Sequence, residues 1–138
     1  MNRTDFGNLD LRGLEEVLPT VEVDTADDYS VSCACEKAIH RLLITFGQLE
    51  RPSRVTVYVY EGPSINFGRM TNSIFFAVAG NERVLTAVHA SLCAVAGAQV
   101  RFGDYIPAQR CVPRMHLEHG VLWLPGDANE WESVDAKQ

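Results

Sequence analysis

The chain has 138 residues, a formal net charge of −6, 46 % hydrophobic residues and 22 % charged residues. This length suits one domain, and these fractions are ordinary for a globular protein, so they exclude a collagenous repeat and a coiled coil. The longest apolar runs are far shorter than the ~20 residues of a membrane-spanning helix. The first twenty residues lack the basic start and apolar run of a secretion signal, so we expect a cytoplasmic protein.

The first third of the chain predicts a short strand followed by a long helix. Spaced apolar residues within 1–19 predict a short helix or an ordered arm, and residues 20–24 alternate as a strand does. Thr25 to Asp28 has the pattern of a capping box with Asp at its fourth position. Apolar residues then recur at helical spacing up to Phe46, which predicts a helix that ends at Gly47. The alternation over residues 29–34 leaves a strand open there.

The rest of the chain alternates between strand, loop and helix patterns. Residues 55–60 give the clearest strand, residues 61–72 are predicted as a loop, and residues 73–78 form a strand that is apolar on both faces. A second helix is expected from Gly80 to Gly97, and a strand follows at 99–102. Residues 114–118 and 121–124 read as a hairpin, followed by an acidic tail.

The order of these elements predicts an α+β domain of the ferredoxin-like kind. In this two-layer βαββαβ arrangement an antiparallel sheet carries both helices on one face, and a C-terminal β-hairpin is appended here. We expect an N-terminal arm or short helix at 1–19, one domain at 20–125 and an acidic tail at 126–138.

Aromatic and basic residues are expected on the sheet face that the helices leave uncovered. If the valines of the clearest strand face the helices, Tyr58 and Tyr60 face away from them, and Phe75 and Arg101 join them from neighbouring strands. Such a face needs a cover. Three covers are compatible with the sequence: the C-terminal hairpin with its Leu122, Trp123 and Leu124, a second copy of the chain, or a ligand.

The predicted loop at 61–72 carries the second candidate contact. Backbone amides near Gly62 and Gly68 are expected either to form an anion-binding nest completed by Arg69, or to belong to a plain exposed hairpin connection. Together these patterns select Tyr58, Tyr60, Arg69, Phe75 and Arg101 as binding residues.

Charge is segregated along the chain. Residues 1–36 carry two basic and nine acidic side chains, residues 37–114 carry nine basic and four acidic ones, and residues 115–138 carry one basic and five acidic ones. Either the acidic ends neutralise the basic middle, or the middle presents a positive surface to an anionic partner. The negative overall charge and the lack of an aromatic RNP-type run argue against nucleic-acid binding.

Cysteine and histidine patterns point to no cofactor. The four cysteines, Cys33, Cys35, Cys93 and Cys111, lack C-x-x-C spacing, so we expect reduced, structural thiols. A zinc site from His89, Cys93, Cys111, His116 and His119 is conceivable, but His116 and His119 would point to opposite faces of one strand. We therefore predict no metal site and no cofactor.

These observations favour a small binding module over an enzyme, because no nucleophile elbow, zinc-protease or dinucleotide motif is present. We predict a self-associating domain, a homodimer or larger homo-oligomer, whose Arg-bearing loops contact an acidic or phosphorylated partner. The alternative is a small ligand-binding protein or enzyme with a pocket near Tyr58, Tyr60 and Arg69.

Overall fold

In the computed structural model, one antiparallel sheet packs against two helices. The structure describes residues 16–25, 28–49, 54–66, 68–80, 82–125 and 131–135. The strands are β1 (Val17–Asp24), β2 (Arg54–Asn66), β3 (Arg69–Ala79), β4 (Val100–Pro107), β5 (Val112–Glu118), β6 (Val121–Pro125) and β7 (Trp131–Asp135). The helices are α2 (Tyr29–Gln48) and α3 (Glu82–Ala96), with single 3-10 turns at Gly97–Gln99 and Ala108–Arg110. The predicted α+β class is confirmed.

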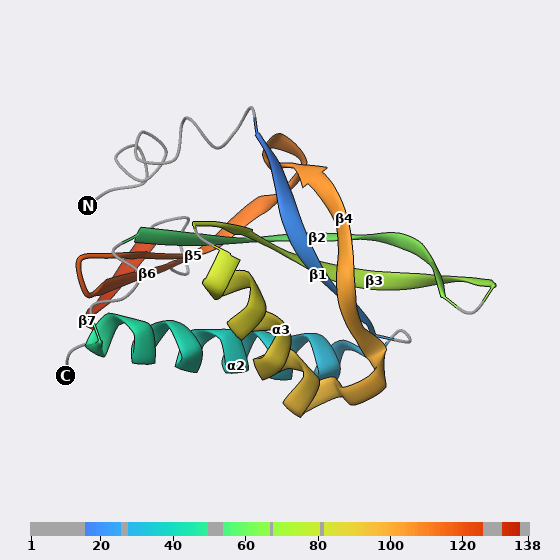
Figure 1. Ribbon diagram of the computed structural model, residues 1–138, viewed down its shortest axis with the longest axis horizontal. Helices are drawn as coiled ribbons and strands as arrows, with labels where there is room; N and C mark the ends of the chain where they lie inside the picture. The colour runs from blue at the N-terminus through green and yellow to red at the C-terminus, as the bar shows by residue number, and fades with distance from the viewer. Residues whose placement is uncertain are drawn as a thin grey trace.

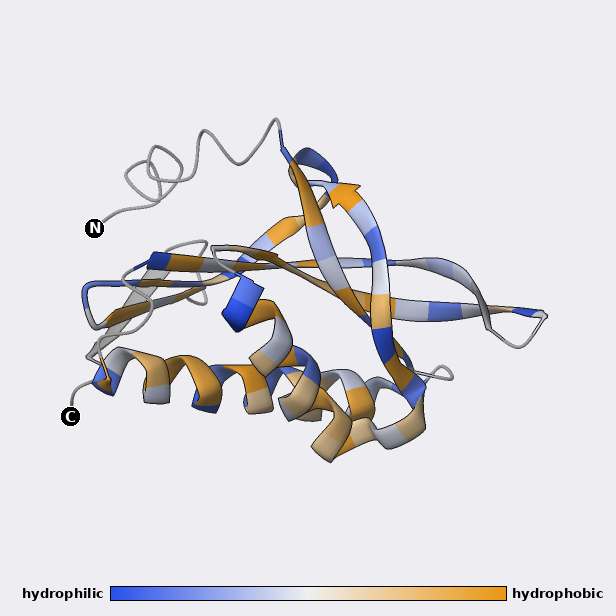
Figure 2. Ribbon diagram, in the orientation of Figure 1, coloured by the Kyte–Doolittle hydropathy of each residue, from blue (hydrophilic) through white to orange (hydrophobic). Residues whose placement is uncertain are grey.

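The main core lies between the sheet and the helices, which cover the same face (Figure 1). Alternate residues of the central strands point toward this side, and the apolar stripes of α2 and α3 meet them. The hydropathy colouring shows these apolar stripes along both helices (Figure 2). Fully buried members include Val21, Val23, Ile39, Leu43, Val55, Val57, Phe76, Val88 and Leu92.

Helix α2 begins at a cap that differs from the predicted capping box. Asp28 is itself the N-cap: its Oδ1 accepts hydrogen bonds from the backbone nitrogen of Ser30 at 2.9 Å and from its hydroxyl at 2.6 Å. These bonds satisfy a backbone donor that a helix start otherwise leaves unpaired. Residues 29–34, where the sequence left strand and helix open, are therefore the first turns of α2.

The ferredoxin-like prediction is wrong, because the sheet is larger and the C-terminal strands belong to it. Its order is β4-β1-β3-β2-β5-β6-β7, and each pair of neighbouring strands is antiparallel. β5 pairs with β2 along Arg54–Val59, and β6 and β7 continue beyond it, so no separate hairpin is appended. The added strands satisfy backbone groups that would otherwise be unpaired along one edge of β2.

The predicted loop at 61–72 is also wrong. β2 and β3 stay in register from Thr56↔Ala79 to Asn66↔Arg69 and form one long hairpin. Beyond Val59 β2 no longer pairs with β5, and Pro63, which lacks a backbone N–H, lies in this outer part of the strand, as proline in a sheet usually does. Residues 62–66 and 69–72, called the arm below, extend past the other strands (Figure 1).

The predicted terminal segments fall mostly outside the described residues. Residues 1–15 of the expected N-terminal arm and residues 126–130 and 136–138 of the expected tail are not described. Within the described part, β1 already begins at Val17 and contains Pro19, and residues 131–135 pair with β6. No helix of the described part is long and apolar enough to cross a membrane.

Candidate functional site

The sheet face opposite the helices, called the far face below, carries four of the five predicted binding residues. Tyr60 lies opposite Phe75, which lies opposite Glu22, which in turn lies opposite Arg101. Directly opposite residues of antiparallel strands share a face, and Tyr58 lies two residues before Tyr60 on the same strand. The structure thus brings these side chains together across β2, β3, β1 and β4.

One half of the far face, the closed half, is covered and forms a second small core. Residues 106–111, called the crossing segment, connect β4 at the sheet edge to β5 beside β2. Their Ile106, Ala108 and Cys111 are buried in a cluster that also contains Leu18, Tyr58, Phe75 and Ala77. A backbone hydrogen bond from Ala108 to the Glu16 carbonyl, 2.8 Å long, holds this segment at the start of β1.

The cover is therefore not the C-terminal hairpin. Leu122 is buried in the main core under the helices, and Leu124 packs against that same core. The closed half also leaves no room for a second copy or a ligand over Tyr58, which is fully buried. Sequence periodicity identifies the face of each strand, but the route of a connection depends on where the two strands lie in the sheet.

At the boundary of the closed half, two tilted aromatic rings and an arginine lie next to one another. The Tyr60 and Phe75 ring centroids lie 5.6 Å apart, and the Arg110 guanidinium lies 5.6 Å from the Tyr60 centroid. The Tyr60 ring also lies over Gly62, where an added Cβ would come within 2.7 Å of the tyrosine oxygen. Tyr60 is thus held in place on three sides.

The other half of the far face is an open groove of about 690 Å³ between the arm and β4. Phe75 and Arg101 line it, but Tyr58, Tyr60 and Arg69 do not. The described residues that line it are Glu22, Pro63, Ser64, Met70, Phe75, Arg101, Phe102, Gly103 and Asp104. A cavity of this volume falls within the range of ligand sites.

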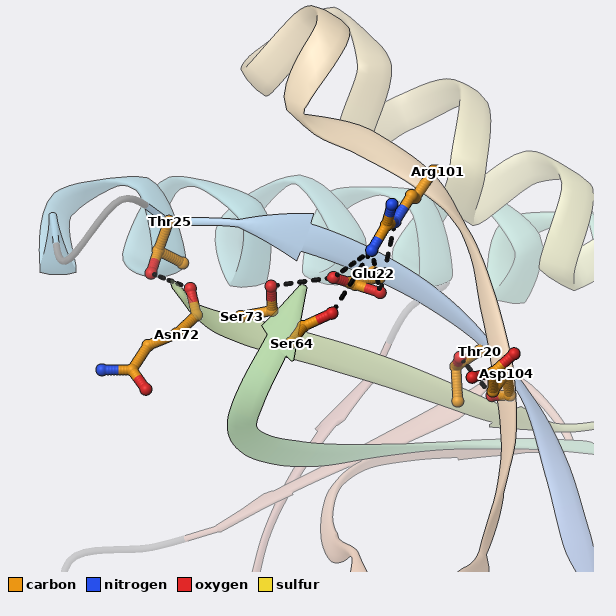
Figure 3. A network of polar contacts seen from close by, with 8 residues as sticks. All are labelled: Thr20, Glu22, Thr25, Ser64, Asn72, Ser73, Arg101 and Asp104. Atoms are coloured by element: carbon orange, nitrogen blue, oxygen red, sulfur yellow. Dashed lines mark hydrogen bonds and ion pairs between the residues drawn. The ribbon is translucent and has the colours of Figure 1, made fainter. Parts of the chain in front are cut away.

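A buried carboxylate forms the floor of the open groove (Figure 3). Arg101 Nη2 donates to Glu22 Oε1 at 3.1 Å and Oε2 at 3.0 Å, and Ser73 Oγ donates to Oε2 at 2.9 Å. Arg101 Nη2 also reaches Ser64 Oγ on the arm at 3.3 Å. The Glu22 side chain is 5 % exposed and that of Arg101 is 50 % exposed. The network therefore ties β1, β3, β4 and the arm together.

The pKa of Glu22 lies below its ordinary value. Burial raises this pKa, but hydrogen bonds from Ser64, Arg101 and Ser73, together with the positive charge of Arg101, lower it by more. Glu22 therefore stays ionised at neutral pH and keeps the guanidinium in one orientation.

Gly103 allows β4 to pair closely with β1 beside this floor. An added Cβ there would come within 2.5 Å of Thr20 Oγ1 and 3.4 Å of the Phe75 ring. The Thr20 hydroxyl donates to the Asp104 carbonyl at 2.7 Å, next to a register shift in the pairing of β1 with β4. A side chain at position 103 would push the strand away from the groove floor.

Arg69 lies at the tip of the arm rather than in an anion-binding nest. It is exposed and pairs in register with Asn66. Gly68 has the positive φ of 76° that the turn requires, but Gly62 belongs to β2, so no nest forms from the two glycines. Within the described ranges, neither Arg69 nor Arg110 makes an ion pair.

Acidic residues from the ends of the chain do neutralise part of its basic middle. Arg101 pairs with Glu22, Arg114 pairs with Glu36 at 3.1 Å, and Arg54 approaches Glu118 at 4.0 Å. By contrast, β7, which carries Glu132 and Asp135, lies at the opposite edge of the sheet from β4. The neutralisation is therefore local, and the arm tip keeps its positive charge.

A buried chain of polar groups beside the closed half was not predicted. Thr56 Oγ1 lies 2.8 Å from Nδ1 of His116, whose Nε2 lies 3.3 Å from Glu118 Oε2. Burial lowers the pKa of His116, although the hydrogen bond and charge of Glu118 act in the opposite direction. This series of hydroxyl, imidazole and carboxylate side chains resembles the nucleophile, base and carboxylate of a catalytic triad. Thr56 and His116 are buried, however, so no substrate reaches the hydroxyl in this conformation. In the sequence, only the alternation of polar residues along β2 and β5 indicates that these side chains share a face.

The cysteines are four free thiols. Cys111 lies in the closed half near the Pro107 carbonyl, and burial raises its pKa. Burial also raises the pKa of Cys35 to about 11. Cys93 Sγ lies 3.8 Å from the His89 ring, which stacks on Phe102 at 4.1 Å. Across the described part of the chain, no three His, Cys, Asp or Glu side chains gather as metal ligands do.

Comparison with known protein families, curated proteins and solved structures found no match for this chain. The site must therefore be interpreted from its own geometry.

Proposed function

We propose that the protein is a cytoplasmic interaction module that self-associates through the free edge of β4 and presents its arms to an acidic or phosphorylated partner. One observation carries this proposal. Among the strands that the structure describes, the eight-residue β4 stands at the end of the sheet order and pairs with β1 alone. Such an edge leaves a row of backbone groups for another strand.

The exposed side chains of β4 support an interface at this edge. Phe102 is 53 % exposed and Tyr105 is 66 % exposed, so two aromatic rings flank the unpaired backbone. Aromatic residues are enriched in the centres of protein interfaces. Tyr58 is fully buried and Tyr60 is partly buried against the closed half, so we place the interface at the strand edge instead of the tyrosine face.

The charges of β4 favour a second copy as the occupant. Antiparallel pairing of β4 with itself brings the first half of one strand beside the second half of the other. Arg101 of each protomer then approaches the partner's Asp104, which is exposed. A two-fold dimer of this kind is closed, and it joins two sheets into one.

The Arg-bearing part of the proposal rests on the arm. Arg69 and Met70 are exposed at its tip, and Met70 also lines the open groove. A dimer presents two such tips, which can engage one partner twice and gain avidity. Guanidinium groups recognise carboxylate and phosphate through paired hydrogen bonds, which favours an acidic or phosphorylated partner.

Native mass spectrometry and light scattering at protein concentrations up to about 0.1 mM test the self-association. We expect a dimer for the native chain and a monomer for Tyr105→Lys, because two added charges would be buried at the new strand pair. Leu49→Lys is the matched control: Leu49 is 64 % exposed, at the end of α2, and the variant should stay dimeric. A monomeric native chain, or a dimer that both variants leave intact, contradicts the β4 interface.

A further inference from the structure

A cavity of about 290 Å³ lies between α2 and the strands β5 and β6, on the face of the sheet that the helices cover. One wall belongs to α2 and consists of Cys33, Glu36, Lys37 and His40. These residues are three and four positions apart, so they share one side of the helix. The opposite wall consists of Arg114 and Met115 on β5 and Leu124 on β6. The volume is near the lower end of the range for ligand sites.

A β-bulge in β5 brings Arg114 to this cavity. Met115 pairs with Val57 and Pro113 pairs with Tyr58, so Arg114 is an extra residue at a shift of register. Bulges re-aim side chains and are frequent beside functional sites. Arg114 Nη2 donates to Glu36 Oε2 at 3.1 Å, and this bond joins the two walls of the cavity.

One nitrogen of a lining residue lacks a hydrogen-bond partner. Nε2 of His40 is shielded from solvent and has no partner in the described part of the chain. Buried polar groups without a partner are rare, because each costs free energy. A half-turn of the imidazole exchanges the positions of its nitrogen and carbon atoms while the helix stays in place. The ring can therefore turn a nitrogen toward a ligand in the cavity.

The polar groups of the cavity that lack an internal partner are hydrogen-bond donors. The Lys37 ammonium can only donate, is exposed and makes no ion pair with any described residue. The imidazole of His40 donates from Nε2 in one neutral tautomer and when protonated. Glu36 is the only acid among the described lining residues, and it already pairs with Arg114. One positive charge is thus left over, which favours an anion.

The inner wall of the cavity is apolar. Met115 is buried in the main core, and Leu124 packs against the same core. A ligand with its anionic group at Lys37 and His40 places carbon atoms against this wall and removes apolar surface from water. A bare inorganic anion would leave the wall uncovered.

We infer that this cavity binds a small organic acid, a carboxylate carried by a short apolar chain or ring. His40 and Lys37 donate to the carboxylate, and Met115 and Leu124 contact the apolar part. The inference goes beyond the proposed function and does not depend on it, because the described lining contains no residue of β4 or of the arm. Failure of one proposal therefore leaves the other standing.

Titration of the full chain with hexanoate at pH 7 tests the inference. The backbone amide signals of Cys33, His40 and Met115 should shift and saturate, and calorimetry should give the same affinity. Hexanol, which keeps the chain without the charge, and hexylamine, which reverses the charge, should not saturate. Acetate, which keeps the charge without the chain, should bind at least tenfold more weakly than hexanoate.

A dipeptide distinguishes two sources of the carboxylate. N-acetyl-glycyl-leucine carries a free carboxyl group beside an apolar side chain, as the C-terminus of a protein does. Tighter binding of this dipeptide than of hexanoate assigns the carboxylate to a partner protein's C-terminus. The reverse order assigns it to a free acid.

Variants then test the assigned roles. His40→Phe keeps a ring but removes the nitrogens, so hexanoate binding should weaken about tenfold or more, while the stability of the chain stays the same or rises. Lys37→Gln should weaken binding about two- to fivefold, because its exposed charge is screened by water. Arg83→Gln removes the same charge from an exposed residue of α3 outside the cavity and should leave the affinity unchanged.

Three results would overturn the inference. They are saturable binding of hexanol or hexylamine at these amides, equal affinity of the native chain and both cavity variants for hexanoate, and the absence of saturable shifts with both hexanoate and the dipeptide.

Discussion

The closed half and the open groove are two parts of one sheet face, and they are filled in opposite ways. Over Tyr58 and Ala77, the crossing segment supplies apolar side chains and makes a core. Over Glu22, no segment crosses, and a carboxylate with its arginine and serine partners forms the floor instead. Phe75 belongs to both parts. One face of a sheet can therefore contain two different environments. A part that is covered by apolar side chains stabilises the fold, and a part that is left uncovered remains available for binding.

The largest stability effect is expected at the residue that the two parts share. Phe75→Ala should lower the free energy of unfolding by about 3–5 kcal/mol, because it removes a buried ring and leaves a cavity under the crossing segment. Urea denaturation followed by circular dichroism measures this change. Phe102→Ala is the control, since this half-exposed ring lies outside the closed half. Equal losses for the two variants would mean that the closed half is not a core.

A smaller loss is expected from the open groove. Glu22→Gln keeps the shape of the side chain but leaves Arg101 without its anion, so we expect a loss of about 1–3 kcal/mol at pH 7. Half of the Arg101 side chain is exposed, and water limits the loss. Glu36→Gln, which breaks the more exposed pair with Arg114, should cost less than about 1 kcal/mol.

The Glu22 variant should also change the pH dependence of stability. The pKa of Glu22 is lower in the folded chain than its ordinary value of 4.5, so the stabilising contribution is complete above about pH 4.5. It is lost as the pH falls through the lower, folded-state value. Denaturation curves between pH 7 and the acid range should therefore converge for the native chain and Glu22→Gln. A constant difference across that range would contradict the ionised carboxylate.

The smallest effect is expected from a hydroxyl in the closed half. The buried oxygen of Tyr58 has no hydrogen-bond partner in the described part of the chain. Tyr58→Phe removes it and keeps the ring, so stability should stay the same or rise by up to about 1 kcal/mol. Thermal denaturation of this variant provides the measurement. A clear loss of stability would show that the hydroxyl is bonded and that the closed half is partly polar.

The helices and the central strands could be predicted because their patterns are local. The stripe from Val31 to Phe46 and the alternation at Val55, Val57 and Val59 depend on 3.6-residue and two-residue periods, which need no tertiary contact. Charge segregation left two outcomes open, and the pairing of Arg101 with Glu22 corresponds to the one in which acidic residues of the ends meet arginines of the middle.

The arm and the site could not be predicted in the same way. Gly62, Pro63 and Gly68 have the composition of a loop, yet pairing with β3 makes two of them strand residues. Glu22 looked like the exposed residue of an alternating strand. It is buried because the side chains of Arg101 on β4 and Ser73 on β3 surround its carboxylate, and Ser64 of the arm holds Arg101 from the other side. All three residues are distant from Glu22 in sequence.

From the sequence alone follow the α+β class, the two helices and the sharing of one face by Tyr58, Tyr60, Phe75 and Arg101, since each depends on short-range periodicity and steric preference. Only the tertiary structure decided that β5 to β7 extend the sheet, that the crossing segment covers half of the far face and that the other half stays open. The physical reason is that unpaired strand edges and exposed apolar faces can be satisfied by any segment that reaches them. Which segment does so depends on the packing of the whole chain.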